Sequence, residues 1–225
     1  MPFIRLALAV LCVAGWAMPP RAQLDHIVVA VRSLDEGIAQ FERLTGVTPA
    51  VGGKHPGRGT ENALVSLGGG SYLEILAPQP GATLSRDDEP LRGIATLTII
   101  DWAIAVPEVD AAVASLKTAG FVTSPPRPGA RLTPSGERLD WMTFALPDVR
   151  RAPFFIRWSP NTRHPSTTAP SGCTLERLRV QDPSADRLGT LLGALGVGGI
   201  VVEGGTASVE AALTCGSRRG VLTSR

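Results

Sequence analysis

The sequence contains an internal repeat, which constrains the fold more than any single motif. Residues 26–35 align without a gap with residues 101–110, an offset of 75 that matches Ala30 with Ala105. Each segment is an apolar strand that runs into a helix with apolar residues at helical spacing. Three more short apolar runs follow each helix, giving the order strand, helix, strand, strand, strand twice. Since one such unit cannot bury its apolar face alone, the two copies are expected to pack together.

The first copy has clear boundaries. A capping box at Ser33 and Glu36 starts its helix, and Gly46 stops it. The last two strands are expected to form a hairpin around three consecutive glycines at 68–70. The four strands of this copy are predicted at residues 24–31, 48–51, 61–67 and 71–76.

Two further copies follow the first. In the second, Gly120 stops the helix, and strands are predicted at residues 101–106, 121–124, 139–146 and 153–158. A third, shorter copy begins at residues 175–180 and continues with a leucine-rich helix and strands at residues 199–202, 207–213 and 220–224. The predicted class is α+β, with a paired domain at residues 23–165, a linker at 166–173 and a third, degenerate module at 174–225.

Charge and composition limit the partners. The formal net charge is +2, and the chain has no concentrated basic run, so the electrostatic footprint of a nucleic-acid binder is missing. We therefore expect small-molecule partners and no nucleic acid.

The N-terminus has two readings. Residues 1–22 have the pattern of a signal peptide, with Arg5 before an apolar stretch and small residues at the end, which predicts an exported or periplasmic protein. The apolar run is too short for stable insertion across a membrane. Alternatively, translation starts at Met18 and the protein is cytoplasmic. Removal of residues 1–22 leaves Cys173 and Cys215, which are able to form one disulfide in an oxidising compartment if the fold brings them together. Two free thiols in a cytosolic protein are the alternative.

Two apolar strands each carry one side chain that is able to bind a metal. His26 lies near the start of the first strand, and Glu74 interrupts the fourth between Leu73 and Ile75. Burying a carboxylate there costs several kcal/mol unless a cation or a hydrogen-bond donor compensates it. A compensating group is therefore expected opposite Glu74.

The motifs around these two residues resemble a known family. The segments LDHIVVAV at 24–31 and LGGGSYLEILAP at 67–78 are similar to the glyoxalase-like branch of the vicinal oxygen chelate superfamily. The resemblance implies paired βαβββ modules that form a half-open barrel around a divalent metal chelated by adjacent substrate oxygens. His26 matches the first-strand ligand of that family, Glu74 the last-strand ligand, and Asp101 stands at the first-strand position of the second module. Such a three-ligand set is able to hold Mn, Fe, Ni or Zn with positions left for substrate.

The later modules depart from the family pattern. Aligning Pro78 with Pro160 puts Ile156 opposite Glu74, so the fourth ligand is missing. The third module has leucines at both ligand positions, which predicts a structural role or a role in homodimerisation.

Aromatic residues support a second hypothesis, a metal-free protein that binds or sequesters an organic ligand on the same fold. The residues that could line its cavity are Trp102, Trp141 and Trp158, with core packing the alternative for each and the stronger expectation for Phe155. His164 lies in a segment similar to the tryptophan-to-histidine turn of the glyoxalase-like group and could close over the site with Arg163, or remain solvated.

The leading hypothesis is a metal-dependent enzyme that acts on a small oxygen-rich substrate, with the metal as Lewis acid and Glu74 or His164 as the proton-transfer group. The reaction class stays open between a lyase or isomerase and a dioxygenase. Resemblance identifies a fold and a site rather than a substrate.

Overall fold

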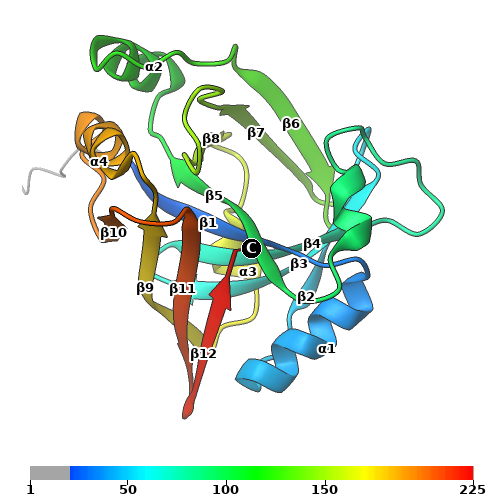
Figure 1. Ribbon diagram of the computed structural model, residues 1–225. Helices are drawn as coiled ribbons and strands as arrows, with labels where there is room; N and C mark the ends of the chain where they lie inside the picture. The colour runs from blue at the N-terminus through cyan, green and yellow to red at the C-terminus, as the bar shows by residue number, and fades with distance from the viewer. Residues whose placement is uncertain (1–20, 225) are drawn as a thin grey trace, which may run out of the picture.

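Eight strands form one closed barrel in the computed structural model, which describes residues 21–224 (Figure 1). The strand order around the barrel is β1-β4-β3-β2-β6-β7-β8-β5. The strands are β1 Gln23–Ala30, β2 Ala50–His55, β3 Thr60–Gly68, β4 Ser71–Pro78, β5 Thr98–Ala105, β6 Arg127–Leu132, β7 Arg138–Phe144 and β8 Phe154–Trp158. The predicted signal peptide lies outside the described residues apart from its last two positions.

The register between β1 and β5 confirms the internal repeat. These antiparallel strands pair His26 with Ala103 and Val28 with Asp101. Under the 75-residue offset His26 corresponds to Asp101 and Val28 to Ala103, so each pair is the repeat of the other. Each strand also has one extra, unpaired residue, Asp25 on β1 and Ile100 on β5, again 75 positions apart. The two modules are therefore related by a local two-fold axis between β1 and β5, including their bulges.

On its other side, the barrel is closed by only a short contact between two strands. Strands β2 and β6 share a single paired position, Lys54 with Leu132. The predicted half-open barrel is thus a closed one whose second seam depends on one residue pair. Val51 and Leu132 beside this seam are about half exposed, which is unusual for large apolar side chains.

Two helices cover the outside of the barrel. Helix α1, Leu34–Thr45, begins at the predicted cap, where the Ser33 hydroxyl accepts from the backbone N–H of Glu36, and it ends at Gly46 in the left-handed region. Gly37 lets α1 approach the sheet closely, since a Cβ there would lie 2.6 Å from a Val31 methyl. Helix α2, Val109–Thr118, covers the second module. The main apolar core lies under these helices, on the outer face of the strands.

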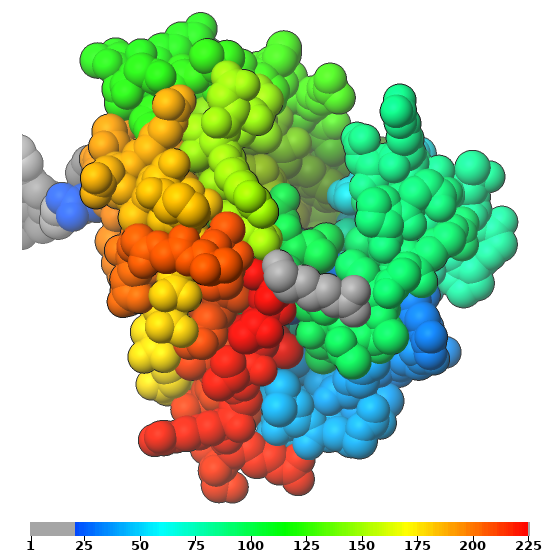
Figure 2. All heavy atoms as spheres, in the orientation of Figure 1, coloured from blue at the N-terminus to red at the C-terminus, as the bar shows by residue number. Residues whose placement is uncertain are grey.

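The third unit has the predicted order of elements but a different topology. It consists of β9 Cys173–Gln181, α4 Ala185–Ala194, β10 Ile200–Glu203, β11 Ser208–Cys215 and β12 Arg218–Thr223. In the first barrel module, the first strand pairs with the fourth, whereas β9 pairs with β10 and β11 in the sheet order β10-β9-β11-β12. This sheet packs against the barrel, and β12 (red) lies against α1 (blue) in Figure 2, where Arg218 donates to the carbonyl of Arg43.

Some predicted boundaries were wrong. Residues 121–124 form no strand, because Phe121 is drawn into the core under α2 and Pro125 and Pro126 interrupt pairing. The sixth strand is instead Arg127–Leu132, whose polar composition concealed it. The segment predicted as a linker at 166–173 contains most of a short helix, α3 Pro165–Thr168. A further 3-10 helix, η1, spans Glu89–Gly93, and no helix within residues 21–224 is long and apolar enough to cross a membrane.

A disulfide links Cys173 on β9 to Cys215 on β11, at directly paired positions of the two strands. The sequence left open a disulfide or two free thiols, and the structure contains the disulfide.

We predict that the Cys173→Ala, Cys215→Ala double variant has a free energy of unfolding lower by about 3–4 kcal/mol. The reason is that the disulfide joins residues 42 positions apart and so restricts the unfolded chain, and the variant loses this restriction. Urea unfolding of both proteins measures the difference. Equal midpoints in oxidising buffer would contradict a stabilising role.

Candidate active site

The inner face of the barrel carries a row of polar side chains. Val28 lies opposite Asp101 on β5 and opposite Glu74 on β4, and residues paired in this way point to the same side of a sheet. Asp101 and Glu74 therefore both face the interior, on either side of Val28, with their Cα atoms about 10 Å apart, twice the spacing between strands.

Glu74 lies between two imidazole rings. Its Oε2 is 3.7 Å from Nε2 of His26, and its Oε1 is 3.7 Å from Nε2 of His55. The side-chain amide of Asn62 donates to Oε1 at 2.7 Å. Burial raises the pKa of Glu74, but His55, His26 and Asn62 outweigh it and hold the pKa below its usual value. The compensating groups expected from the sequence are the donating amide of Asn62 and the two imidazole rings, and Glu74 with its lowered pKa is ionised at neutral pH.

Asp25 fixes the orientation of His26. The bulge in β1 brings both neighbouring side chains inside, and Asp25 Oδ1 lies 2.6 Å from His26 Nδ1. Assigning the Nδ1 proton to this hydrogen bond leaves His26 Nε2 facing Glu74. Burial lowers the pKa of His26, but the hydrogen bond and charge of Asp25 outweigh it, so the pKa is raised.

The second oxygen of Asp25 accepts two more hydrogen bonds. Trp158 donates its Nε1–H to Oδ2 at 3.0 Å, and His164 Nε2 lies 3.0 Å from the same oxygen. Asp25 is 1% exposed, and burial alone would raise its pKa; hydrogen bonds with His164 and His26 lower it to about 2. His164 thus reaches the site indirectly, through Asp25.

Aromatic rings enclose His26. Tyr72 stacks on it at 4.6 Å between ring centroids, and Phe154 meets it edge-on at 5.3 Å. Glu74 pairs with Val28, and Phe154 pairs with Ala103, the residue that corresponds to Val28 in the second module. Phe154 is therefore the equivalent of Glu74 in the second module.

The assignment of Ile156 to that position was therefore wrong by two residues. The alignment assumed that Pro78 and Pro160 mark the same point, but Pro78 is the last residue of β4, and Pro160 lies two residues beyond the end of β8. The conclusion that the fourth ligand is missing is unchanged, because a phenylalanine stands there.

Asp101 differs chemically from Glu74. Burial raises its pKa to about 6, and the main counteracting group is the backbone N–H of Trp102, which donates to Oδ1 at 2.8 Å. No hydrogen bond or ion pair joins Asp101 to His26 or Glu74 within the described chain. It faces the same interior from β5, the strand next to β1.

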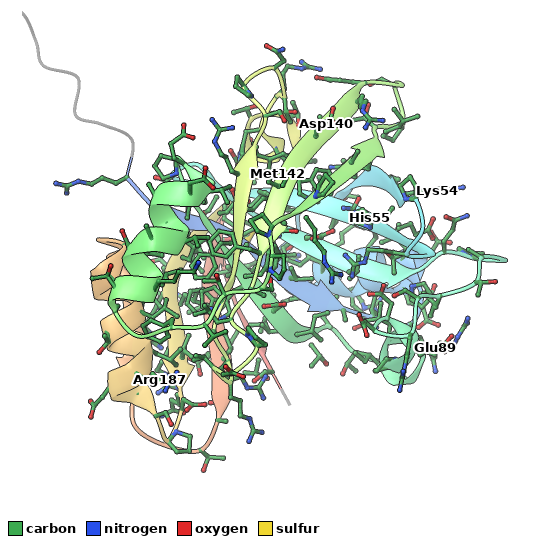
Figure 3. The ribbon with its side chains drawn as sticks, turned by 90° about the horizontal axis from the view of Figure 1, so that it is seen from above. Lys54, His55, Glu89, Asp140, Met142 and Arg187 are labelled. Atoms are coloured by element: carbon green, nitrogen blue, oxygen red, sulfur yellow. A yellow bond between two sulfur atoms is a disulfide. The ribbon has the colours of Figure 1, made fainter. Side chains whose placement is uncertain are left out.

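His55 is a site residue that the sequence analysis missed, because it stands in a glycine-rich segment beyond the strand predicted at residues 48–51. The strand extends to His55, whose Nδ1 lies 2.9 Å from the hydroxyl of Thr60. Figure 3 shows the alternation, with Lys54 extending away from the molecule and His55 at the next position of β2. A bulge between Val51 and Gly53 shifts the alternation of β2 by one residue, and this shift turns His55 towards the interior.

The tryptophans divide between two places. Trp141 and Trp158 contact each other inside the barrel, with centroids 5.2 Å apart. Trp102 lies on the opposite face of β5, in the core, with its Nε1 donating to the carbonyl of Arg151. The structure therefore does not bring Trp102 to the other two. Phe155 packs in the core as expected.

Arg163 does not close over the site with His164. Its guanidinium forms an ion pair with Glu137 on the surface, while His164 turns inward to Asp25.

The predicted metal ligands are only partly brought together. Among residues 21–224, no group of three or more His, Cys, Asp or Glu side chains is arranged to hold a metal ion, so the set His26, Glu74 and Asp101 is not assembled. His26 Nε2 and Glu74 Oε2 do face each other at 3.7 Å. Two donors at about 2.1 Å from one ion lie roughly 3–3.5 Å apart, so this pair would fit after an approach of a few tenths of an ångström. Asp25 behind His26 is the usual partner of a metal-binding imidazole.

A family model described as a glyoxalase-like domain matches residues 24–196. The chain belongs to this glyoxalase-like family. The match spans the whole barrel and extends to α4 in the C-terminal unit, which agrees with the α+β barrel predicted from the two motifs. No curated protein matches the sequence.

Comparison with solved structures finds one of similar fold and two of lower similarity. A hypothetical protein from Staphylococcus aureus superposes with a TM-score of 0.63 at 15% identity, over 91% of this chain and 86% of its own. That coverage includes the C-terminal sheet. Methylmalonyl-CoA epimerase from Mycobacterium tuberculosis gives 0.42 at 21% identity, over 61% and 87% of the two chains. The epimerase from Streptomyces coelicolor in complex with 2-nitronate-propionyl-CoA gives 0.44 at 18%, over 64% and 99%.

The three hydrogen bonds to Asp25 make stability depend on pH. Because its pKa falls from 3.8 to about 2 on folding, the ionised carboxylate contributes about 2 kcal/mol above pH 3.8, and this is lost as the pH falls through 2. We predict that Asp25→Asn lowers the free energy of unfolding by at least this amount at pH 6, and by progressively less below pH 3.8.

Denaturant unfolding of wild type and variant at several pH values measures this difference. The exposed Asp87→Asn is the matched control and should show a small difference at every pH. A difference for Asp25→Asn that does not change between pH 6 and pH 2.5 would contradict the account.

Proposed function

We propose that this glyoxalase-like protein is an enzyme that moves a proton on a small, oxygen-rich organic substrate, with Glu74 as the proton acceptor and a divalent metal held by His26 and Glu74. One observation carries the proposal: an ionised carboxylate stands inside the barrel with an imidazole Nε2 3.7 Å from each of its oxygens. A buried carboxylate with a shifted pKa marks a candidate functional site, and an ionised carboxylate is the form that accepts a proton.

The residues present have distinct roles in this proposal. Asp25 holds His26 in one tautomer, so that Nε2 is directed at Glu74. Asn62 fixes Glu74 through Oε1 and leaves Oε2 towards the interior. Mn, Fe, Ni or Zn bound there would act as a Lewis acid on adjacent oxygens of the substrate. His55, whose pKa burial lowers, is a neutral imidazole beside the same carboxylate, with its Nε2 3.4 Å from the side-chain amide nitrogen of Asn62.

A metal-free binding protein is the second candidate, and a specific observation favours it. The charge of Glu74 is already compensated by protein groups, and Trp141 and Trp158 form an aromatic pair within the barrel. In this case an organic ligand would bind without turnover. The two candidates differ in whether a change at Glu74 alters chemistry or only affinity.

The disulfide bears on where the protein acts. The Cys173–Cys215 disulfide is typical of oxidising compartments, and it supports the reading in which residues 1–22 are a signal peptide. We therefore propose that the protein acts outside the cytoplasm.

The proton-transfer role can be tested without knowing the natural substrate. Small 2-oxo and 2-hydroxy carbonyl compounds are incubated with the protein and Mn²⁺, Fe²⁺, Ni²⁺ or Zn²⁺ in D₂O, and deuterium incorporation next to the carbonyl is followed by NMR. We predict that Glu74→Gln lowers the rate of incorporation by at least about 100-fold, because the amide cannot accept the proton.

Glu61→Gln on neighbouring β3 is the matched control, since that side chain is directed away from the interior, and its rate should stay within twofold of wild type. Incorporation that is unchanged in Glu74→Gln would contradict the role of this residue.

A further inference from the structure

Arg131 is a buried cation inside the barrel that the proposed chemistry does not use. It lies on β6 opposite Leu139 and is 4% exposed. Its Nη1 donates to the carbonyl of Gly52, its only hydrogen bond within the described chain, and no carboxylate there forms an ion pair with it. A guanidinium has five N–H donors and stays charged, so most of its capacity remains unused.

Two glycines on β2 make room for this side chain. Gly53 lies against the guanidinium, since a Cβ there would be 3.2 Å from Nη1. Gly52 supplies the accepting carbonyl and also lies against Asn62, whose Oδ1 is buried without a hydrogen-bond partner among the described residues. The arginine and an unsatisfied amide oxygen thus border the same part of the interior.

A cavity opens beside Arg131 at the weak seam between β2 and β6. Its volume is about 150 Å³, which suits a molecule of a few heavy atoms. Its lining is mixed: Ala50, Leu64 and Leu139 supply apolar walls, and Thr168 and Ala169, which follow His164, cover it. The charged lining residues are Arg131, Arg163 and Glu137, and the last two form an ion pair with each other. Because Arg131 is part of the lining, its unpaired N–H groups are available to a ligand there.

The cavity leads towards Glu74. Leu64 pairs with Glu74 across β3 and β4, so their side chains lie on the same inner face. Burial lowers the pKa of Arg131, while the charge of Glu74 raises it, which places the two groups within electrostatic reach. A ligand held at Arg131 would extend past Leu64 to the carboxylate.

We propose that Arg131 binds the carboxylate of a small organic acid, whose short apolar part contacts Leu64 and Leu139. A guanidinium fork matches a carboxylate with two parallel hydrogen bonds, and the apolar walls favour a short carbon chain over a bare inorganic anion. The subsite itself stands on Arg131 and its cavity; only the statement that the bound acid is the substrate rests on the proposed function.

Binding of propionate and lactate to the full-length protein, followed by NMR titration and by thermal stabilisation, tests the subsite. Propionamide, the neutral isostere of propionate, and inorganic phosphate are the comparison probes. We expect propionate to bind at least tenfold more tightly than propionamide and more tightly than phosphate. Equal binding of propionate and propionamide would overturn the proposal. Stronger binding of phosphate than of propionate would also overturn it. Both comparisons use only the wild-type protein.

Variants then locate the site. Arg131→Gln should weaken propionate binding by roughly 10- to 100-fold, the range for loss of charge-assisted hydrogen bonds. Arg127→Gln, an exposed arginine on the same strand, should bind as wild type does. Equal losses in both variants, or no loss in Arg131→Gln, would contradict the assignment.

Glu74→Gln separates this inference from the proposed function. It should bind propionate at least as tightly as wild type, because it removes a negative charge from the interior. Binding that persists there while deuterium incorporation is unaffected by the variant would sink the proton-transfer role and leave the subsite intact.

Discussion

The buried carboxylate of Asp25 holds together parts of the chain that are far apart in sequence. It accepts from His26 on β1, from Trp158 at the end of β8, and from His164 in the segment before α3. These three bonds join the first module, the second module and the cover of the barrel at one point. An ionised group that is 1% exposed is tolerated only when its hydrogen-bonding capacity is filled in this way. The orientation of His26, and with it the geometry at Glu74, follows from this arrangement.

The two barrel modules are equivalent in backbone and different in chemistry. Their bulges coincide under the two-fold axis, yet the unpaired residue is Asp25 in one module and the partly exposed Ile100 in the other. Likewise, Glu74 corresponds to Phe154. The first module therefore supplies Asp25, His26 and Glu74, while the second supplies Phe154 and the tryptophan that donates to Asp25, together with the separate charged groups Asp101 and Arg131. The repeated fold thus encloses a single asymmetric interior.

The repeat and the capped helix could be predicted because they depend on local pattern, whereas the pairing of His26 with Glu74 was implied by the resemblance to the glyoxalase-like family. Apolar periodicity gave the strands, and a lone carboxylate in an apolar strand required a partner. The other donors to Glu74 could not be found in the same way. Asn62 meets Glu74 only through the register of β3 with β4, and register follows from packing of the whole barrel. Arg131 lies on a strand that carries too little apolar pattern to be recognised.

The incorrect predictions also concern properties that depend on the position of a residue or strand in the sheet. Trp102 and Asp101 are neighbours in sequence, but successive residues of a strand face opposite sides, so the tryptophan enters the core. Ile156 was misplaced because two prolines were assumed to end equivalent strands. The third unit repeats the order of elements without the pairing, since order along the chain does not specify which strands become neighbours.

We propose that His26 and Glu74 together hold a divalent metal ion within the barrel. This proposal is tested by elemental analysis of the protein purified without a metal-chelating tag, and again after incubation with Mn²⁺, Fe²⁺, Ni²⁺ or Zn²⁺ and removal of excess metal. We predict close to one divalent ion per chain, and loss of this ion in the His26→Ala, Glu74→Ala double variant. A wild-type protein that retains no ion after incubation, or a double variant that retains as much as wild type, would contradict it.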